Sequence, residues 1–429
     1  MGRVEVAQSA ALGGARPQSV ALTPTPPAIW AQGELGLGGP LGFGGHPSAL
    51  VTASSIGSSN RIRVLYCLVE HGPLSRADLA RIVRVPRGSV APIVAGLLAD
   101  GMLIEGEARL EPAKTGKPSR PLWFGPAISP PIAVQVQASR VVSARISQGG
   151  HVVQRLEETL SPKMRASEIE TLVVDLAREI LGTGPTCGVG LAWPAVWDHA
   201  DGTVLSCTPI PALNGSTLLP QLTAALDARV FPQDDARALA LGQQWFGEAR
   251  GTRNLAALQI SAGIGAGVVI DGRAFAADGQ FPEVGHMCVQ LDGALCACGR
   301  RGCWETVGSL EWLRRQAGRL NWPNSESATP GDFVRAPGPA AAKVLEEYAR
   351  NIAVGLVNMA TCLGVRRFLL HGEVVTGGQR LEAMVRDRVA RGACLPGTPD
   401  IQVDFSKLNQ EAGLLGAAAL PLAHAIEGV

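Results

Sequence analysis

"GHMCVQLDGALCACGRRGCWE", from Gly285 to Glu305, is the most informative stretch of the sequence, because it gathers one histidine and four of the chain's nine cysteines. Three of these cysteines follow the spacing C-x-C-x4-C, namely Cys296, Cys298 and Cys303. His286 lies ten residues before the first of them. Thiolates and imidazole are the usual ligands of zinc, and four of them complete a tetrahedral structural site. The pattern therefore predicts one structural Zn2+ ion bound by these four side chains.

The cysteines as a whole do not indicate disulfide bonds. Nine is an odd number, which fits poorly with a disulfide framework, and the N-terminus lacks the basic-then-apolar pattern of a secretory signal. No run approaches the roughly 18 apolar residues of a membrane helix. We therefore expect a cytoplasmic protein with no membrane partner. Cys288 could compete as a metal ligand, and a group of reduced cysteines without metal is the alternative.

Residues 1–56 differ in composition from the rest of the chain. They are rich in Gly, Pro, Ala and Ser, with no apolar period of a helix or a strand, so little burial offsets the entropy of ordering. We expect a disordered tail, or a start that is not genuinely translated. The whole sequence is 46% hydrophobic and 17% charged, which is enough apolar residue content for the packed cores of roughly two to three domains.

A small helical module is predicted over residues 57–126. Three stretches with helical spacing follow one another, Ser75 is suited to cap the second, and a two-stranded wing comes after the third. Ten Lys and Arg against six Asp and Glu give this segment a net charge of +4, although the whole chain carries only +1. Such a basic footprint is typical of a winged helix-turn-helix bound to DNA. The alternative is a helical domain with a solvated basic face.

The third helical stretch, roughly Arg87 to Ala99, is the predicted reading helix. Pro92 disturbs it, because proline removes a backbone donor and clashes with the carbonyl four residues earlier. We expect the helix either to start late, with Ser89 as its N-cap, or to be kinked at its tip. The residues predicted to contact DNA are Arg76, Arg87, Ser89 and Lys117.

Residues 131–429 show the pattern of one mixed α/β body in two lobes, joined to the first module by a hinge rich in proline and glycine. Strands and amphipathic helices alternate along it. The predicted elements are a strand meander over 132–160, a helix over 166–181, a buried strand over 187–194, a helix and strand over 218–231, a helix over 235–247, two strands over 254–275, a long helix over 340–364 and a strand over 366–372.

The quoted segment resembles, without gaps, the zinc signature of the ROK family, which includes repressors, open reading frames and sugar kinases. The similarity extends over almost all of residues 57–429, including "GPLSRADLARIV" and "TGKPSRPLWF", which look like the DNA-binding half of the family's repressors. The resemblance implies an α/β fold class: an N-terminal winged helix-turn-helix followed by a two-lobed actin-like, ribonuclease-H-like body of the ATPase type.

The motifs of the family's kinases are altered in this sequence. Gln135–Ser139 replace the phosphate turn D-x-G-G-T, Ser261–Gly265 replace G-T-G-I-G, and His371–Gly372 replace the Gly-Gly beside adenosine. Asp235 matches the catalytic aspartate, and Arg237 nearby would favour its ionised form. The resemblance therefore implies no catalytic residue in use, with Asp235 vestigial, and no sugar kinase activity.

The sugar contacts of the family are better preserved. Glu283, His286 and Glu305 match E-x-G-H and G-C-x-E, whereas Asp234 stands where the family has asparagine. Carboxylates accept hydrogen bonds from hydroxyls, and a histidine can bind zinc with one nitrogen and sugar with the other. The resemblance implies that the ligand-binding residues are Asp234, Asp235, Glu283, His286 and Glu305. The alternative is that these acids are inherited relics.

Three functions are compatible with these patterns. We favour a DNA-binding transcriptional regulator, and by resemblance a repressor, that senses a sugar or sugar derivative and binds a double-stranded operator as a homodimer or tetramer. An active ATP-dependent sugar kinase is less favoured, because three nucleotide motifs are changed together. A ligand-independent regulator controlled by a protein partner is the third possibility.

Overall fold

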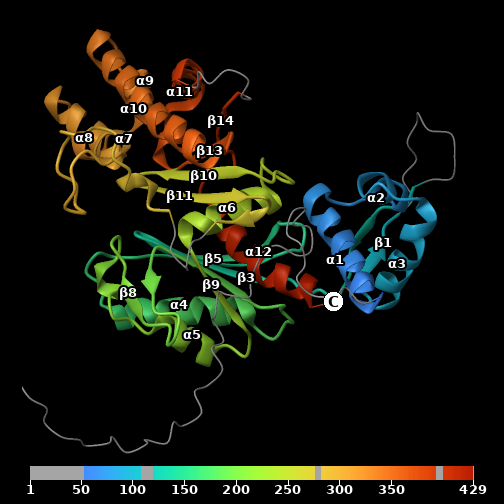
Figure 1. The fold of residues 1–429 in the computed structure, drawn as a ribbon. Helices are drawn as coiled ribbons and strands as arrows, with labels where there is room; N and C mark the ends of the chain where they lie inside the picture. Colours follow the sequence, from blue (N-terminus) through green and yellow to red (C-terminus); the bar gives the residue numbers. More distant parts are fainter. Residues whose placement is uncertain (1–52, 108–118, 276–281, 393–399, 429) are drawn as a thin grey trace, which may run out of the picture.

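The computed structural model describes residues 53–107, 119–275, 282–392 and 400–428 (Figure 1). Most of the predicted tail, residues 1–52, lies outside this part of the chain. Within the described ranges, no helix is long and apolar enough to cross a lipid bilayer.

Three helices and a small sheet form the N-terminal module. The helices are α1 (Ala53–His71), α2 (Arg76–Ile82) and α3 (Arg87–Ala99), and the antiparallel strands are β1 (Leu103–Glu105) and β2 (Leu122–Phe124). Ser75 caps α2 as predicted, in a reciprocal capping box with Asp78.

Two boundaries in this module differ from the sequence-based expectation. α1 begins at Ala53, inside the predicted tail, because no proline interrupts the chain before His71 and each added helical residue gains a hydrogen bond. α3 begins at Arg87, so the late start at Ser89 is wrong. Pro86 immediately precedes the helix with φ of −57°, a fixed backbone angle already suited to helix entry, and Pro92 lies inside the helix.

The first lobe of the body is a five-stranded sheet in the order β5-β4-β3-β6-β9. Its strands are β3 (Ile132–Gln137), β4 (Arg140–Ile146), β5 (Val152–Thr159), β6 (Val189–Trp193) and β9 (Val230–Asp234). The meander β3-β4-β5 is antiparallel, whereas β3, β6 and β9 are parallel. Helices α4 (Ala166–Leu181) and α5 (Leu218–Ala225) bury their apolar sides against one face, together with the short elements β7 (Val196–Trp197), β8 (Val204–Ser206) and η1 (Pro211–Leu213).

The second lobe repeats this plan with the strand order β12-β11-β10-β13-β14. Its strands are β10 (Leu255–Ile260), β11 (Ile264–Ile270), β12 (Arg273–Ala274), β13 (Arg367–His371) and β14 (Gln402–Phe405). The long helix α10 (Pro339–Leu363) and α11 (Gly378–Gly392) share the core of the outer face. The other elements of this lobe are η2 (Val284–His286), α7 (Glu305–Gly308), α8 (Leu310–Arg319), η3 (Ser325–Ser327), α9 (Pro330–Arg335) and η4 (Glu373–Gly377).

Two helices lie between the sheets, α6 (Asp235–Phe246) and α12 (Glu411–Glu427), as Figure 1 shows. α12 packs on the inner face of the first sheet and α6 on the inner face of the second. The backbones of the two helices touch at glycines: a Cβ on Gly242 would lie 1.8 Å from the carbonyl oxygen of Ala412, and one on Gly416 would lie 1.6 Å from that of Ala238. The prediction of a mixed α/β body in two lobes is confirmed.

Candidate functional site

The predicted metal ligands lie on a tight knuckle between η2 and α7. Backbone bridges join Cys288 to Cys303 and Leu295 to Arg301, so the segment folds back on itself as a small hairpin. Gly302 has φ of 73° and passes so close to Gln290 that a Cβ would lie 1.6 Å from its carbonyl oxygen. Only glycine fits such a position, which explains the residue before the last cysteine.

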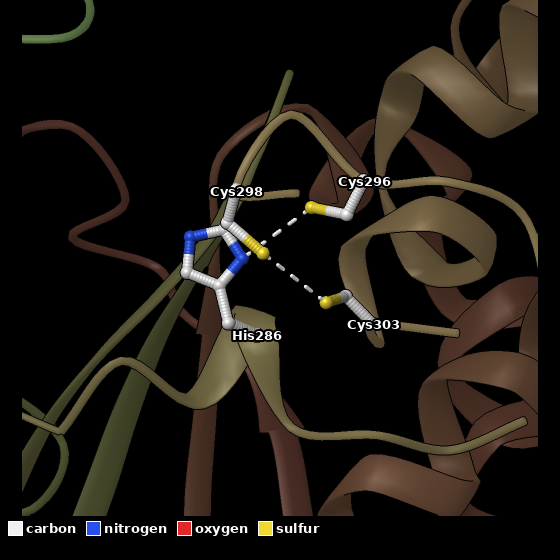
Figure 2. Close-up of side chains that lie close together, drawn as sticks. All are labelled: His286, Cys296, Cys298 and Cys303. Carbon is white, nitrogen blue, oxygen red and sulfur yellow. Dashed lines mark hydrogen bonds between the residues drawn. The ribbon is translucent and has the colours of Figure 1, made fainter. Parts of the chain in front are cut away.

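The side chains of His286, Cys296, Cys298 and Cys303 point toward one another, as Figure 2 shows, and their ligand atoms all lie within 4.8 Å of each other. The Sγ atoms of Cys298 and Cys303 are 3.6 Å apart. Cys296 Sγ is 3.5 Å from His286 Nδ1. A tetrahedral ion with zinc-like bond lengths needs separations of about 3.8 Å between two sulfurs and about 3.5 Å between sulfur and nitrogen. The cluster can therefore hold a metal ion, and the distances fit a tetrahedral one.

The surroundings favour an ionised thiol at one corner of the cluster. Hydrogen bonds from the backbone and side chain of Arg300 lower the pKa of the Cys298 thiol to about 6, and the thiolate is the form that binds metal. Cys288, the possible competitor, is exposed and does not belong to the group of four.

Glu305, predicted as a sugar contact, lies against the metal cluster. Its Oε1 accepts a hydrogen bond from Cys296 Sγ at 2.9 Å and lies 3.3 Å from His286 Nδ1. Its other oxygen faces the β10–β11 turn, where a Cβ on Gly263 would lie 3.4 Å away. The carboxylate thus stands between the cluster and this turn.

Asp234 and Asp235 lie where β9 ends and α6 begins. Asp234 caps the helix by accepting a hydrogen bond from the Arg237 amide at 3.1 Å. Burial, reinforced by the charges of Asp235 and Glu283, raises the pKa of Asp234 to about 7. Burial also raises the pKa of Asp235, with Glu283 adding to the effect.

The expectation that Arg237 favours an ionised Asp235 is wrong. The pKa of Asp235 is raised, because burial outweighs the hydrogen bonds from backbone amides that lower it. The charge of Arg237 acts on Asp234 instead, and burial lowers the pKa of the guanidinium itself. The pKa of Asp234 therefore lies near neutral pH, and the pKa of Asp235 is shifted in the same direction.

The β10–β11 turn, Ser261–Gly265, brings the predicted ligand residues together. On one side, a Cβ on Gly265 would lie 3.6 Å from the Cβ of Ala236, beside the aspartate pair. On the other side, Gly285 approaches the carbonyl oxygen of Ile264, which places Glu283 and His286 next to the same turn. The charge of Glu283 acts on both aspartates. Acids from three distant parts of the sequence thus surround one turn.

Polar side chains occupy the positions that match the kinase phosphate turn. Gln137 Oε1 accepts a hydrogen bond from Arg140 Nε at 2.6 Å, and the same guanidinium reaches Gln410 just before α12. Gln135 packs against the α12 backbone, where a Cβ on Gly413 would lie 2.3 Å from its Nε2. His371 stands at the position that the family's kinases place next to adenosine, and burial lowers the pKa of its imidazole to about 4. The link from Arg140 to the residue before α12 was not predicted, although an arginine after the altered turn is visible in the sequence.

The residues predicted to contact DNA lie in different settings. Arg87 and Ser89 are exposed at the start of α3. The guanidinium of Arg76 forms an ion pair with Glu105 on β1, so this arginine is engaged within the module. Lys117 lies outside the described residues.

Comparison with known proteins shows to which family the body of the chain belongs. Residues 143–424 match the ROK family. The chain belongs to the ROK family. Relatives in it include the "Glucokinase" of Thermotoga maritima, 26% identical over 64% of this chain and 92% of that protein. The "Xylose repressor" of Caldicellulosiruptor bescii is 22% identical over 84% of this chain and 94% of that protein.

A solved structure described as a ROK family transcriptional regulator, homologous to the Escherichia coli MLC protein, resembles the present one with a TM-score of 0.69. It is 23% identical, and the match covers 87% of this chain and 97% of that one. At this identity the likeness concerns the fold alone. This ROK protein therefore shares the overall fold of that solved structure.

Proposed function

We propose that this ROK protein is a DNA-binding transcriptional repressor whose body senses a sugar or sugar derivative. The observation that carries the proposal is the contrast between two groups of residues, those around the β10–β11 turn and those at the positions of the family's phosphate turn. Asp235, Glu283, His286 and Glu305 surround the β10–β11 turn, whereas Gln135–Ser139 replace an acid and two glycines on the phosphate side. A site that keeps hydroxyl acceptors and loses phosphate contacts suits sensing better than phosphoryl transfer.

The N-terminal module is the proposed winged helix-turn-helix. Its α3 carries exposed Arg87 and Ser89 at its start, where the reading helix of such a module meets base edges. We propose that Arg76 and Lys117 add phosphate or minor-groove contacts, and that a homodimer or tetramer binds a palindromic operator in the cytoplasm. Relatives that span more than four fifths of this chain are named xylose repressors, which supports this proposal.

Zinc is the metal that we propose for the cluster of His286, Cys296, Cys298 and Cys303. The donor set of three sulfurs and one nitrogen is a common structural zinc shell. When bound, the ion would fix the knuckle and hold His286 through Nδ1, the nitrogen that faces Cys296. Nε2 of the same ring is then left for a sugar hydroxyl.

Sugar kinase activity is the second candidate, because Asp235 is retained and glucokinases are among the relatives. The two functions are separated by one set of measurements on the purified full chain. We expect D-xylose or D-glucose to raise the melting temperature and to change affinity for duplex DNA selected from a random library, without ATP. We expect no ATP-dependent phosphorylation of either sugar. Turnover that Asp235→Asn abolishes would instead identify a kinase, and sugar-insensitive DNA binding would favour control by a protein partner.

A further inference from the structure

The N-terminal module shares its hydrophobic core with the ends of the two central helices. Leu65 and Val69 of α1 belong to the same buried cluster as Trp245 near the end of α6 and Ile426 near the end of α12. Figure 1 shows α12 running from between the lobes to the N-terminal helices, where the C-terminus is marked. The module is therefore joined to the body through helix ends as well as through the chain.

One side chain of α1 contacts both central helices. The Tyr66 ring meets the edge of Trp245 with centroids 5.7 Å apart and an interplanar angle of 74°. The Tyr66 hydroxyl donates a hydrogen bond to Glu427 Oε1 at 2.8 Å. A second link lies nearby, since Arg250 Nε after α6 donates to the carbonyl oxygen of Val69. Because Tyr66 contacts both α6 and α12, a movement of these two helices changes the contacts of α1.

The opposite end of α6 lies in the candidate ligand site, because Asp234 caps the helix and Asp235 is its first residue. The glycine contacts at Gly242 and Gly416 leave no space between the backbones of α6 and α12. A helix pair packed so closely moves as one body, since interiors are dense and poorly compressible. A displacement at Asp235 is therefore carried along both helices to their far ends.

We propose that Tyr66 couples the ligand site to the DNA-binding module through the packed pair α6–α12. This inference rests on the proposed sugar-sensing function and adds the path by which sugar binding would affect the DNA-binding module. Sugar hydroxyls bound at the aspartates favour one position of the helix pair, and the contacts of Tyr66 with Trp245 and Glu427 set the position of α1 accordingly. Tyr66 is a positioning residue, because it touches neither sugar nor DNA in this scheme.

The test compares Tyr66→Phe with Tyr348→Phe. Tyr348 is buried in the second lobe, and its hydroxyl has no hydrogen-bond partner among the described residues, so the control makes the same chemical change without losing a hydrogen bond. For each full-length protein, calorimetry gives the affinity for D-xylose or D-glucose. Fluorescence anisotropy gives the affinity for the selected duplex with and without that sugar.

We expect Tyr66→Phe to retain sugar affinity and to reduce the sugar-induced change in DNA affinity by about threefold or more, within the usual range of allosteric coupling. Tyr348→Phe keeps the coupling of the wild type. Glu427→Leu behaves like Tyr66→Phe, whereas Glu427→Gln keeps an acceptor and restores most of the coupling. Wild-type coupling in both Tyr66→Phe and Glu427→Leu overturns the inference. If the wild type itself shows no sugar response, the proposed function fails first, and the inference with it.

Discussion

Replacing Asp234 by asparagine is expected to stabilise the protein above neutral pH. Asp234 caps α6 through its hydrogen bond with the Arg237 amide, and asparagine is an equally good N-cap. Asp234→Asn therefore keeps the cap and removes a carboxylate whose pKa is raised from 3.8 to about 7, first by burial and then by the charge of Asp235. The variant also restores the residue that the family has at this position.

The magnitude follows from the raised pKa. A folded-state pKa above the unfolded value means that the folded protein binds the proton more tightly, so stability falls as pH rises from 3.8 to about 7 and stays reduced above it. At about 1.4 kcal/mol per pKa unit, the full difference sets an upper limit of about 4 kcal/mol. Because the side chain is partly exposed and solvent screens it, we expect a gain of about 1–2 kcal/mol at pH 8.

Urea unfolding at pH 5 and pH 8, followed by tryptophan fluorescence, measures this gain. Asp227→Asn is the matched control, because it makes the same change at an exposed position in the same lobe. We expect Asp234→Asn to be more stable than the wild type at pH 8, with a smaller difference at pH 5, and the control to show neither effect. An Asp234→Asn variant that gains no stability at pH 8, or gains equally at both values, would refute the reasoning.

Four other predictions concern the metal, the ligand, the helix pair and DNA. Cys298→Ser should lower zinc content from about one ion per chain, whereas Cys288→Ser, an exposed neighbour outside the group of four, should leave it unchanged in elemental analysis. Glu283→Gln should weaken sugar affinity about ten- to a hundredfold in calorimetry; equal affinities would place the site elsewhere. Gly416→Ala should cost about 1–3 kcal/mol in urea unfolding, because its Cβ would meet the Ala238 carbonyl, while Gly428→Ala, with 3.5 Å to its nearest neighbour, should be nearly neutral. Arg87→Ala should relax sequence preference in mobility shifts, whereas Lys117→Ala should weaken binding to all duplexes evenly.

The parts of the fold that the sequence predicts are those set by local patterns. Alternating and helical periodicity placed the meander β3-β4-β5 and the helix α4, since burial of one face depends on neighbouring residues. The metal cluster was predictable for the same reason, because its three cysteines lie within eight residues of chain. The helix cap at Ser75 also depends only on residues three positions apart.

The features that the sequence did not predict depend on distant contacts. Glu305 was expected to face sugar alone, but the fold places its carboxylate against Cys296 as well. The bond from Arg140 to Gln410 joins residues 270 positions apart, and no periodicity reports such a pair. The raised pKa of Asp235 follows from burial between lobes, which a neighbouring arginine in the sequence does not reveal.

The shared core between α1 and α12 also fixes the order in which the chain can fold. Leu420, Ala423 and Ile426 complete the cluster that contains Leu65, yet they lie far beyond Leu65 in the sequence and are synthesised long after it. The N-terminal module is made before α12, and domains generally fold as they emerge. Here, however, the N-terminal module lacks part of its apolar core until α12 has been synthesised. A truncated chain that ends before α12 would therefore lack part of the core of its N-terminal module as well as one of its two central helices.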